Sequence, residues 1–209
     1  MQGRPLRLRR LGTGPRKVLW IGGIHGNEPE GVVATAALPQ ALEASGLTKA
    51  VTLLVLEDDN PDGRAAGTRT NAHGVDLNRN FPAPNFDAHN PAYGGSPLSQ
   101  PESKALYDLI VAERPTLVIA CHSWLGASFV NYDGPAQTLA ERFSRLSGMA
   151  LRPSNALGEA TPGSLGSWLS QDLGIAVLTL EWQRGSDSAR DWQQTSAAVL
   201  AILSNDPRS

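Results

Sequence analysis

Histidine and glutamate residues follow three short apolar runs of this chain, in a pattern that suits a divalent metal ion. His25 and Glu28 lie three residues apart after the run that ends at Ile24, and His122 follows a second run. Imidazole and carboxylate groups bind zinc, and catalytic zinc sites commonly use three protein ligands and keep one position for water. Glu181 follows a third apolar run. These residue types predict a metal site with a further carboxylate beside it.

The glycine-rich stretch around His25 has two other interpretations. Residues 21–30 read IGGIHGNEPE, and glycines that join a strand to a helix are typical of phosphate-binding loops. The dinucleotide pattern needs glycines at offsets zero, two and five, but His25 occupies the second position counted from Gly23, and no GK[ST] follows. A glutamate at a helix N-terminus is also ordinary. The pair of His25 and Glu28 therefore predicts a metal site only together with His122.

Alternating strand and helix patterns must position these residues. Strands are predicted near Leu6–Leu11, Lys17–Ile24, Val51–Glu57, Thr116–Cys121, Ser128–Tyr132 and Ile175–Glu181. Helices are predicted from Pro29 towards Gly46, with a break near Pro39, and near Pro101–Ala112, Pro135–Ser147, Ser164–Leu173 and Ala189–Leu203. This order predicts an α/β domain whose helices cover a largely parallel sheet. Ligands of such sheets lie beyond the carboxyl ends of the strands, so the metal ligands are expected to meet there.

A long segment between Asp58 and Gln100 carries further polar motifs. It is rich in Asn, Gly, Pro and Asp and shows no sustained period, which predicts an irregular and functional segment. It contains Asn60-Pro61-Asp62-Gly63, then GTRTN at 67–71 and GVDLNRNFP at 74–82. The first of these motifs also fits a plain turn.

The motifs together resemble the zinc metallocarboxypeptidase family. The shared elements are HxxE, a downstream NPDG, an arginine before DxNRNF, a histidine before serine and an aromatic residue, and a C-terminal glutamate, in the order of the family from His25 to Glu181. The chain is most similar to short bacterial members that resemble murein peptide amidase, through HGNEPEG, GTRTN, DLNRNFP and TPGSLGSW. The resemblance implies a three-layer α/β/α sandwich with a mixed, largely parallel central sheet. It also implies one Zn²⁺ per chain.

The resemblance assigns the metal-binding and proton-transfer roles residue by residue. His25, Glu28 and His122 match the zinc ligands of the family. Glu181 matches the general base, which takes a proton from water and later passes it to the leaving nitrogen. Asp76 matches a carboxylate that orients a zinc-bound histidine, which is expected to be His25.

The same resemblance assigns the residues that bind substrate. Arg69 matches the arginine that faces the developing oxyanion. Asn78 and Arg79 match the pair that grips the free carboxylate of the substrate, because a guanidinium holds a carboxylate by two parallel hydrogen bonds. Ser123 matches a position that contacts the substrate backbone. Arg69 and Arg79 also fit ordinary surface residues.

The implied activity is hydrolysis of an amide next to a free carboxylate in a small peptide. The preferred substrate is the γ-D-glutamyl-diaminopimelate linkage of murein peptides. One alternative is removal of an ordinary C-terminal L-amino acid, and another is deacylation of N-acyl amino acids, as in the aspartoacylase and succinylglutamate desuccinylase group. NPDG together with NRNF favours the peptidases. A binding module without catalysis fits least, since the ligands, Arg69 and Glu181 are all retained.

Composition limits the other possibilities. The chain has 209 residues, which predicts a single catalytic domain over 1–209, and its net charge of −2 gives no field for binding nucleic acid. No apolar run is long enough to cross a membrane, and the one cysteine, Cys121, predicts a reducing, cytoplasmic compartment. Arginines that interleave with leucines in residues 4–11 predict a half-exposed edge strand rather than a basic membrane-binding arm. Oligomeric state does not follow from the sequence.

One departure from the family affects the pocket. Classical members carry a tyrosine some two dozen residues before the catalytic glutamate, but none occurs between Asn155 and Glu181. The chain is also short for the family, which predicts a small, open pocket.

Overall fold

The computed structural model describes residues 2–154 and 161–204. Within these residues a single seven-stranded sheet has the order β1-β3-β2-β4-β7-β5-β6. Its strands are β1 (Leu8–Leu11), β2 (Arg16–Ile21), β3 (Val51–Leu56), β4 (Leu117–Trp124), β5 (Phe129–Asp133), β6 (Ala150–Leu151) and β7 (Ala176–Gln183). The α-helices are α1 (Pro29–Ser45), α2 (Pro61–Ala66), α3 (Pro101–Glu113), α4 (Gln137–Ser147), α5 (Leu165–Asp172) and α6 (Ser188–Leu203). Short 3₁₀ turns form at Leu47–Lys49, Leu77–Arg79 and Pro91–Tyr93.

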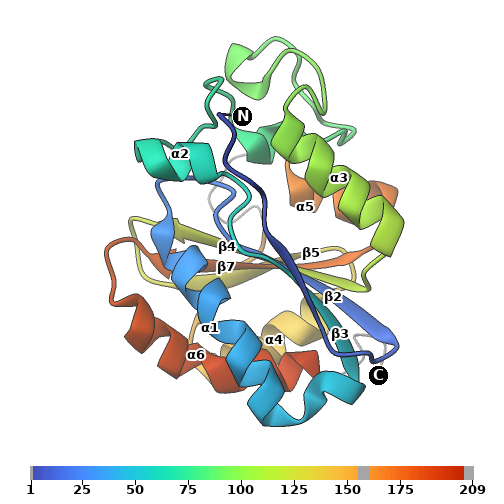
Figure 1. The fold of residues 1–209 in the computed structure, drawn as a ribbon, viewed down its shortest axis with the longest axis vertical. Helices are drawn as coiled ribbons and strands as arrows, with labels where there is room; N and C mark the ends of the chain where they lie inside the picture. The colour runs from blue at the N-terminus through green and yellow to red at the C-terminus, as the bar shows by residue number, and fades with distance from the viewer. Residues whose placement is uncertain (1, 155–160, 205–209) are drawn as a thin grey trace.

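The sheet lies between two layers of helices (Figure 1). Helices α1, α4 and α6 cover one face, and α3 and α5 cover the other. Side chains of successive strand residues point to opposite faces of the sheet, so Trp20 packs with the first helix layer and Leu19 with the second. This arrangement confirms the predicted three-layer α/β/α fold.

The strands that carry the site are parallel neighbours. β3, β2, β4 and β7 pair in parallel, whereas β1 pairs with β3 and β5 pairs with β7 in antiparallel fashion. All six residues of β3 are buried, as expected for a strand covered on both faces. The prediction of a mixed, largely parallel sheet is confirmed. β1 lies at the edge of the sheet, as predicted for this strand.

The predicted break of the first helix near Pro39 is wrong. α1 continues from Pro29 to Ser45 with Pro39 inside it. A proline removes one helical hydrogen bond. Leu38, Pro39 and Leu42 are buried against the sheet and α6, and this packing holds the helix across the missing bond.

Several further boundaries differ from the prediction, and β2 ends at Ile21 rather than at Ile24. β4 continues through His122 to Trp124 and β7 continues through Glu181 to Gln183, so both functional residues lie within strands. The motif at 60–63 begins a short helix, because the Asn60 side chain accepts a hydrogen bond from the Gly63 N–H at 2.9 Å. β6 has only two residues and was not predicted. In the part of the chain that the structure describes, no helix is long and apolar enough to cross a membrane.

A glycine lets α1 approach β4 closely, directly behind the predicted metal ligands. A Cβ atom at Gly31 would lie 2.8 Å from the Cys121 Cβ and 2.9 Å from the Cys121 carbonyl oxygen. Overpacking costs about 1–3 kcal/mol, and alanine regains up to about 1 kcal/mol in a helix interior. We expect Gly31→Ala to lower the free energy of unfolding by about 1–2 kcal/mol in urea titrations.

The control for this variant is Val33→Ala in the same helix, where the side chain is 45% exposed. It should change the unfolding free energy by less than about 0.5 kcal/mol. Equal stability of Gly31→Ala and the wild type would show that α1 and β4 are not in close contact.

Candidate active site

His25, Glu28 and His122 converge on one point at the carboxyl ends of the parallel strands. One ligand atom from each side chain lies within 4.8 Å of the others. His25 Nδ1 is 3.0 Å from Glu28 Oε1 and 3.1 Å from His122 Nδ1, and His122 Nδ1 is 3.0 Å from Glu28 Oε2. All three residues are buried. The structure therefore brings the three predicted ligands together.

The chain reaches this geometry through neighbouring parallel strands. β2 and β4 pair in parallel, so the loop after β2 and the end of β4 meet at the same edge of the sheet. Gly23 turns the chain after β2 with φ of +67°, and a Cβ there would lie 2.4 Å from an Asp58 carboxylate oxygen. This turn places His25 in the loop and Glu28 at the start of α1.

Asp76 contacts His25, as predicted. Its Oδ1 lies 3.1 Å from His25 Nε2, and its Oδ2 accepts a hydrogen bond of 2.9 Å from Arg69 Nε. Burial raises the pKa of Asp76, but the hydrogen bond with His25 and the charges of Arg69 and Arg79 outweigh it and hold that pKa below its usual range. An ionised Asp76 accepts a hydrogen bond from the Nε2–H of His25, which leaves Nδ1 as the nitrogen of His25 that can bind a metal ion.

Cationic and amide donors surround the Glu28 carboxylate. Arg69 Nη1 lies 3.2 Å and Arg184 Nη2 lies 3.4 Å from Glu28 Oε1, and the Ser123 N–H donates to Oε2 at 3.1 Å. Burial raises the pKa of Glu28, but its hydrogen bonds with His122 and His25 outweigh it and hold the pKa well below its usual range. Glu28 is therefore ionised and suited to a cation.

Glu181 lies opposite His122 in the register of β4 and β7. Burial raises the pKa of Glu181 to about 7, although the charges of His122, Arg69 and Arg184 act in the other direction. A carboxylate with a pKa near neutrality can both accept and return a proton.

A cavity of about 230 Å³ collects the predicted residues. Its lining contains eight of them: His25, Glu28, Arg69, Asn78, Arg79, His122, Ser123 and Glu181. Asp76, the ninth, bonds to His25 from outside this lining. Asn78 is held by the first turn of α5, because its Oδ1 accepts a hydrogen bond of 3.0 Å from the Leu165 N–H.

Three residues that the sequence interpretation missed belong to the same site. Asn131 and Asp133 line the cavity from β5, and Arg184 contacts Glu28 from the loop after β7. Arg184 follows Glu181 by three residues, and this proximity is a signal that could have found it. Asn131 and Asp133 carried no motif.

The donor set fits zinc. Two imidazole nitrogens and one carboxylate are the ligand types of catalytic zinc sites, and Asp76 supplies the partner that such a histidine needs. The side-chain hydroxyl of buried Ser123 has no hydrogen-bond partner in the described part of the chain, although it lines the cavity. These observations define the site as that of a metal-dependent hydrolase.

Comparison with known proteins places this hydrolase in a family. Residues 1–204 match the zinc carboxypeptidase family, Peptidase M14, and the chain belongs to it. Murein peptide amidase A from Escherichia coli strain K12 is 35% identical over an alignment of 180 residues, which covers 78% of this chain and 70% of that protein. The chain is thus a zinc metallohydrolase, as the motifs predicted.

Solved structures agree. The crystal structure of murein-tripeptide amidase from Escherichia coli O157 has a TM-score of 0.78 and 28% identity, and the match covers 100% of this chain and 90% of that chain. Carboxypeptidase A from Helicoverpa armigera has a TM-score of 0.81 at 19% identity, over 96% of this chain and 65% of that chain. The second likeness concerns the fold alone.

Proposed function

We propose that this chain, acting as one catalytic domain, hydrolyses the amide between γ-D-glutamate and diaminopimelate in murein peptides, with Glu181 as the general base. The resemblance to murein peptide amidases supports the substrate class. The cavity lining contains both cationic and acidic side chains. This combination favours a substrate such as diaminopimelate, which carries both a carboxylate and an ammonium group.

The cationic side of the cavity suits the free carboxylate of the substrate. Arg79 lines the cavity, and its Nη1 donates to the Asn78 carbonyl at 2.8 Å, which leaves its other guanidinium N–H groups for a carboxylate. The Asn78 amide group is oriented by its bond from Leu165. A carboxylate bound here places the neighbouring amide beside Glu181 and the metal ligands.

The acidic side suits an ammonium group. Asp133 lies against Gly166, where a Cβ would be 2.3 Å from its Oδ2, and no Lys, Arg or His in the described residues forms an ion pair with it. Burial raises the pKa of Asp133, and a hydrogen bond with Ser154 opposes this rise. The Oδ1 atom of Asn131, beside it in the cavity, is buried and has no partner within the described segments.

Diaminopimelate supplies both charges. It carries a carboxylate next to the scissile amide and, at the far end of its side chain, an ammonium group beside a second carboxylate. Asp133 lies four residues below the level of Glu181 in the antiparallel pair of β5 and β7, which is roughly 13 Å along the strands. An N-acyl aspartate or a peptide with an apolar C-terminal residue has no cation for Asp133.

The chemistry divides between the metal and the chain. Zinc, when bound, would activate a water molecule and polarise the scissile carbonyl. Glu181 accepts the proton of the attacking water and passes it to the leaving nitrogen, so that hydrolysis yields the γ-carboxylate of glutamate and the free amine of diaminopimelate. Arg69 stabilises the negative charge that develops on the carbonyl oxygen.

A substrate panel tests this proposal. The zinc-loaded protein is incubated with L-Ala-γ-D-Glu-diaminopimelate, with hippuryl dipeptides that end in apolar or basic residues, and with N-acetyl-aspartate. Release of diaminopimelate, with little cleavage of the others, is the expected result. Cleavage confined to the hippuryl dipeptides would establish an ordinary carboxypeptidase instead, and cleavage confined to N-acetyl-aspartate a deacylase. No cleavage of any compound would favour a binding module.

Asp133→Asn tests the acidic side of the cavity. Loss of one charge-assisted hydrogen bond to the ammonium group should raise KM for the diaminopimelate peptide by about ten-fold or more, with a smaller change in kcat. Asp87→Asn in the polar segment before α3 is the matched control and should leave KM unchanged. An unchanged KM in Asp133→Asn would remove the cation site from the proposal while leaving the hydrolase intact.

A further inference from the structure

A second and larger cavity lies at the opposite edge of the sheet. It has a volume of about 560 Å³ and lies between the end of α3, the starts of β4 and β7, and the end of α5. It shares no lining residue with the cavity of the metal site. Thr116 at this edge and His122 at the other are six residues apart on one extended segment, which is about 20 Å. Its volume is within the range of small-molecule sites.

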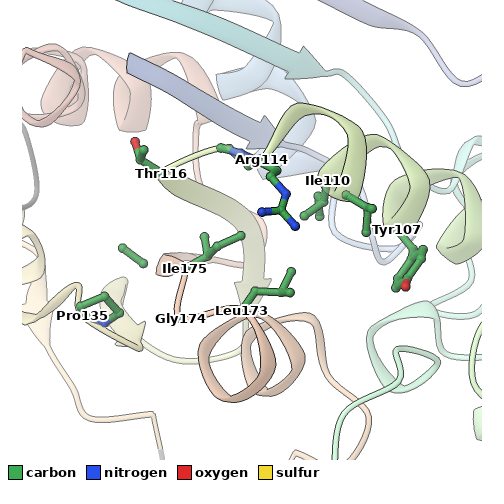
Figure 2. Close-up of a pocket in the computed structure, with 11 residues that line it drawn as sticks. Tyr107, Ile110, Arg114, Thr116, Pro135, Leu173, Gly174 and Ile175 are labelled. Carbon is green, nitrogen blue, oxygen red and sulfur yellow. The ribbon is translucent and has the colours of Figure 1, made fainter. Parts of the chain in front are cut away.

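The guanidinium of Arg114 lies in this cavity (Figure 2). Figure 2 shows it extended between the side chains of Ile110, Leu173 and Ile175. In the part of the chain that the structure describes, no hydrogen bond or ion pair engages this guanidinium. The neighbouring Glu113 is already taken by Arg10 and Lys17.

The backbone of Arg114 is also unusual. It ends α3 in the left-handed region with φ of +49°, where glycine is the common residue. A residue that carries a Cβ atom loses about 1 kcal/mol of stability in this backbone conformation relative to glycine. The chain carries a long cation at a position where glycine would be more stable, and the cation extends over an apolar cavity.

The remaining lining is apolar. Ile110, Val111, Leu173 and Ile175 line it together with two prolines and an alanine, with Tyr107 at one end (Figure 2). The Thr116 hydroxyl, a polar group of the lining, is already used, because it donates to the Lys17 carbonyl at 3.2 Å. A peptide would leave its backbone N–H and C=O groups without partners here. The lining therefore suits an apolar body with a single anionic end.

We propose that this cavity binds a small monocarboxylate with an aliphatic body, whose carboxylate pairs with Arg114. The pairing is charge-assisted and can be bidentate, and the body removes the exposed side chains of Val111 and Leu173 from water. The site is separate from the metal centre and does not depend on the substrate proposed for it.

Octanoate is a suitable probe, with 1-octanol as its uncharged counterpart. Calorimetric titration of the zinc-loaded protein should show saturable binding of octanoate and binding of 1-octanol that is about ten-fold weaker or more. Arg114→Gln and Arg114→Gly should both weaken octanoate binding by at least about ten-fold. The glycine variant suits the left-handed backbone, so it should be no less stable than the wild type in thermal unfolding.

Two control variants locate the bound probe. Arg145→Gln removes an exposed arginine from the last turn of α4, as Arg114→Gln does at the end of α3, and should leave the affinity unchanged. Arg79→Gln removes the predicted carboxylate-binding residue of the metal site and should also leave it unchanged. Loss of binding in Arg79→Gln but not in Arg114→Gln would place octanoate in the metal site and overturn the proposal. The absence of saturable binding, or equal binding of 1-octanol, would also overturn it.

Discussion

Replacement of His122 by alanine is expected to remove zinc and, with it, all measurable hydrolysis. His122 supplies one of three ligand atoms that lie within 4.8 Å of one another. Catalytic zinc sites commonly need three protein ligands, and only two remain in this variant. Metal analysis of the purified protein should find about one zinc per wild-type chain and almost none in His122→Ala. His25→Ala should behave in the same way.

The control for metal loss is His89→Ala, which changes an exposed histidine outside the cavity and should keep its zinc. The fold should survive loss of the metal, because two apolar clusters on the two faces of the sheet contain the core. Chelated wild type and His122→Ala should therefore unfold cooperatively at similar temperatures, below that of the zinc-loaded protein. Full activity of the metal-free wild type would contradict the zinc mechanism.

The metal ligands could be predicted because their positions follow from the direction of the strands. His25 and His122 come after or within parallel strands, and parallel neighbours bring their carboxyl ends to the same edge. The convergence of His25 and His122 therefore follows from the predicted strand order alone. The resemblance also predicted the partnership of Asp76 with His25, but strand direction does not, because the position of Asp76 depends on where a long irregular segment crosses the site.

The contacts of Asp133 and Arg184 with the site do not follow from the direction of the parallel strands. β5 runs antiparallel to β7, so that its last residue, Asp133, pairs with Val177 near the start of β7, away from the edge that carries the metal ligands. Strand direction at this point has no local sequence signal. Arg184 reaches Glu28 because the chain turns back directly after β7, with the Gly185 N–H bonded to Glu30 Oε1 at 2.7 Å. Both positions are consequences of tertiary packing.

Replacement of Glu181 by glutamine is expected to lower turnover by about 10²–10⁴-fold while the zinc content stays at one per chain. Glu181 lies beside the three ligands and is not one of them, so the variant separates proton transfer from metal binding. KM should change much less than kcat, since the amide group keeps the size of the side chain. Glu141→Gln, which changes an exposed residue of α4, is the control.

The pH dependence tests the same role with a defined sign. A general base works only as the carboxylate, so kcat/KM should rise with pH through the pKa of Glu181. Burial raises this pKa from 4.5 to about 7, and the positive charge of bound zinc favours the carboxylate and lowers it again. The acidic limb of the wild-type profile should therefore lie between these two values, and it should be absent in Glu181→Gln. A variant that keeps both the limb and more than a tenth of wild-type turnover would show that another group accepts the proton. Asp133, the remaining carboxylate of the described cavity lining that is not a predicted metal ligand, would then be the residue to replace.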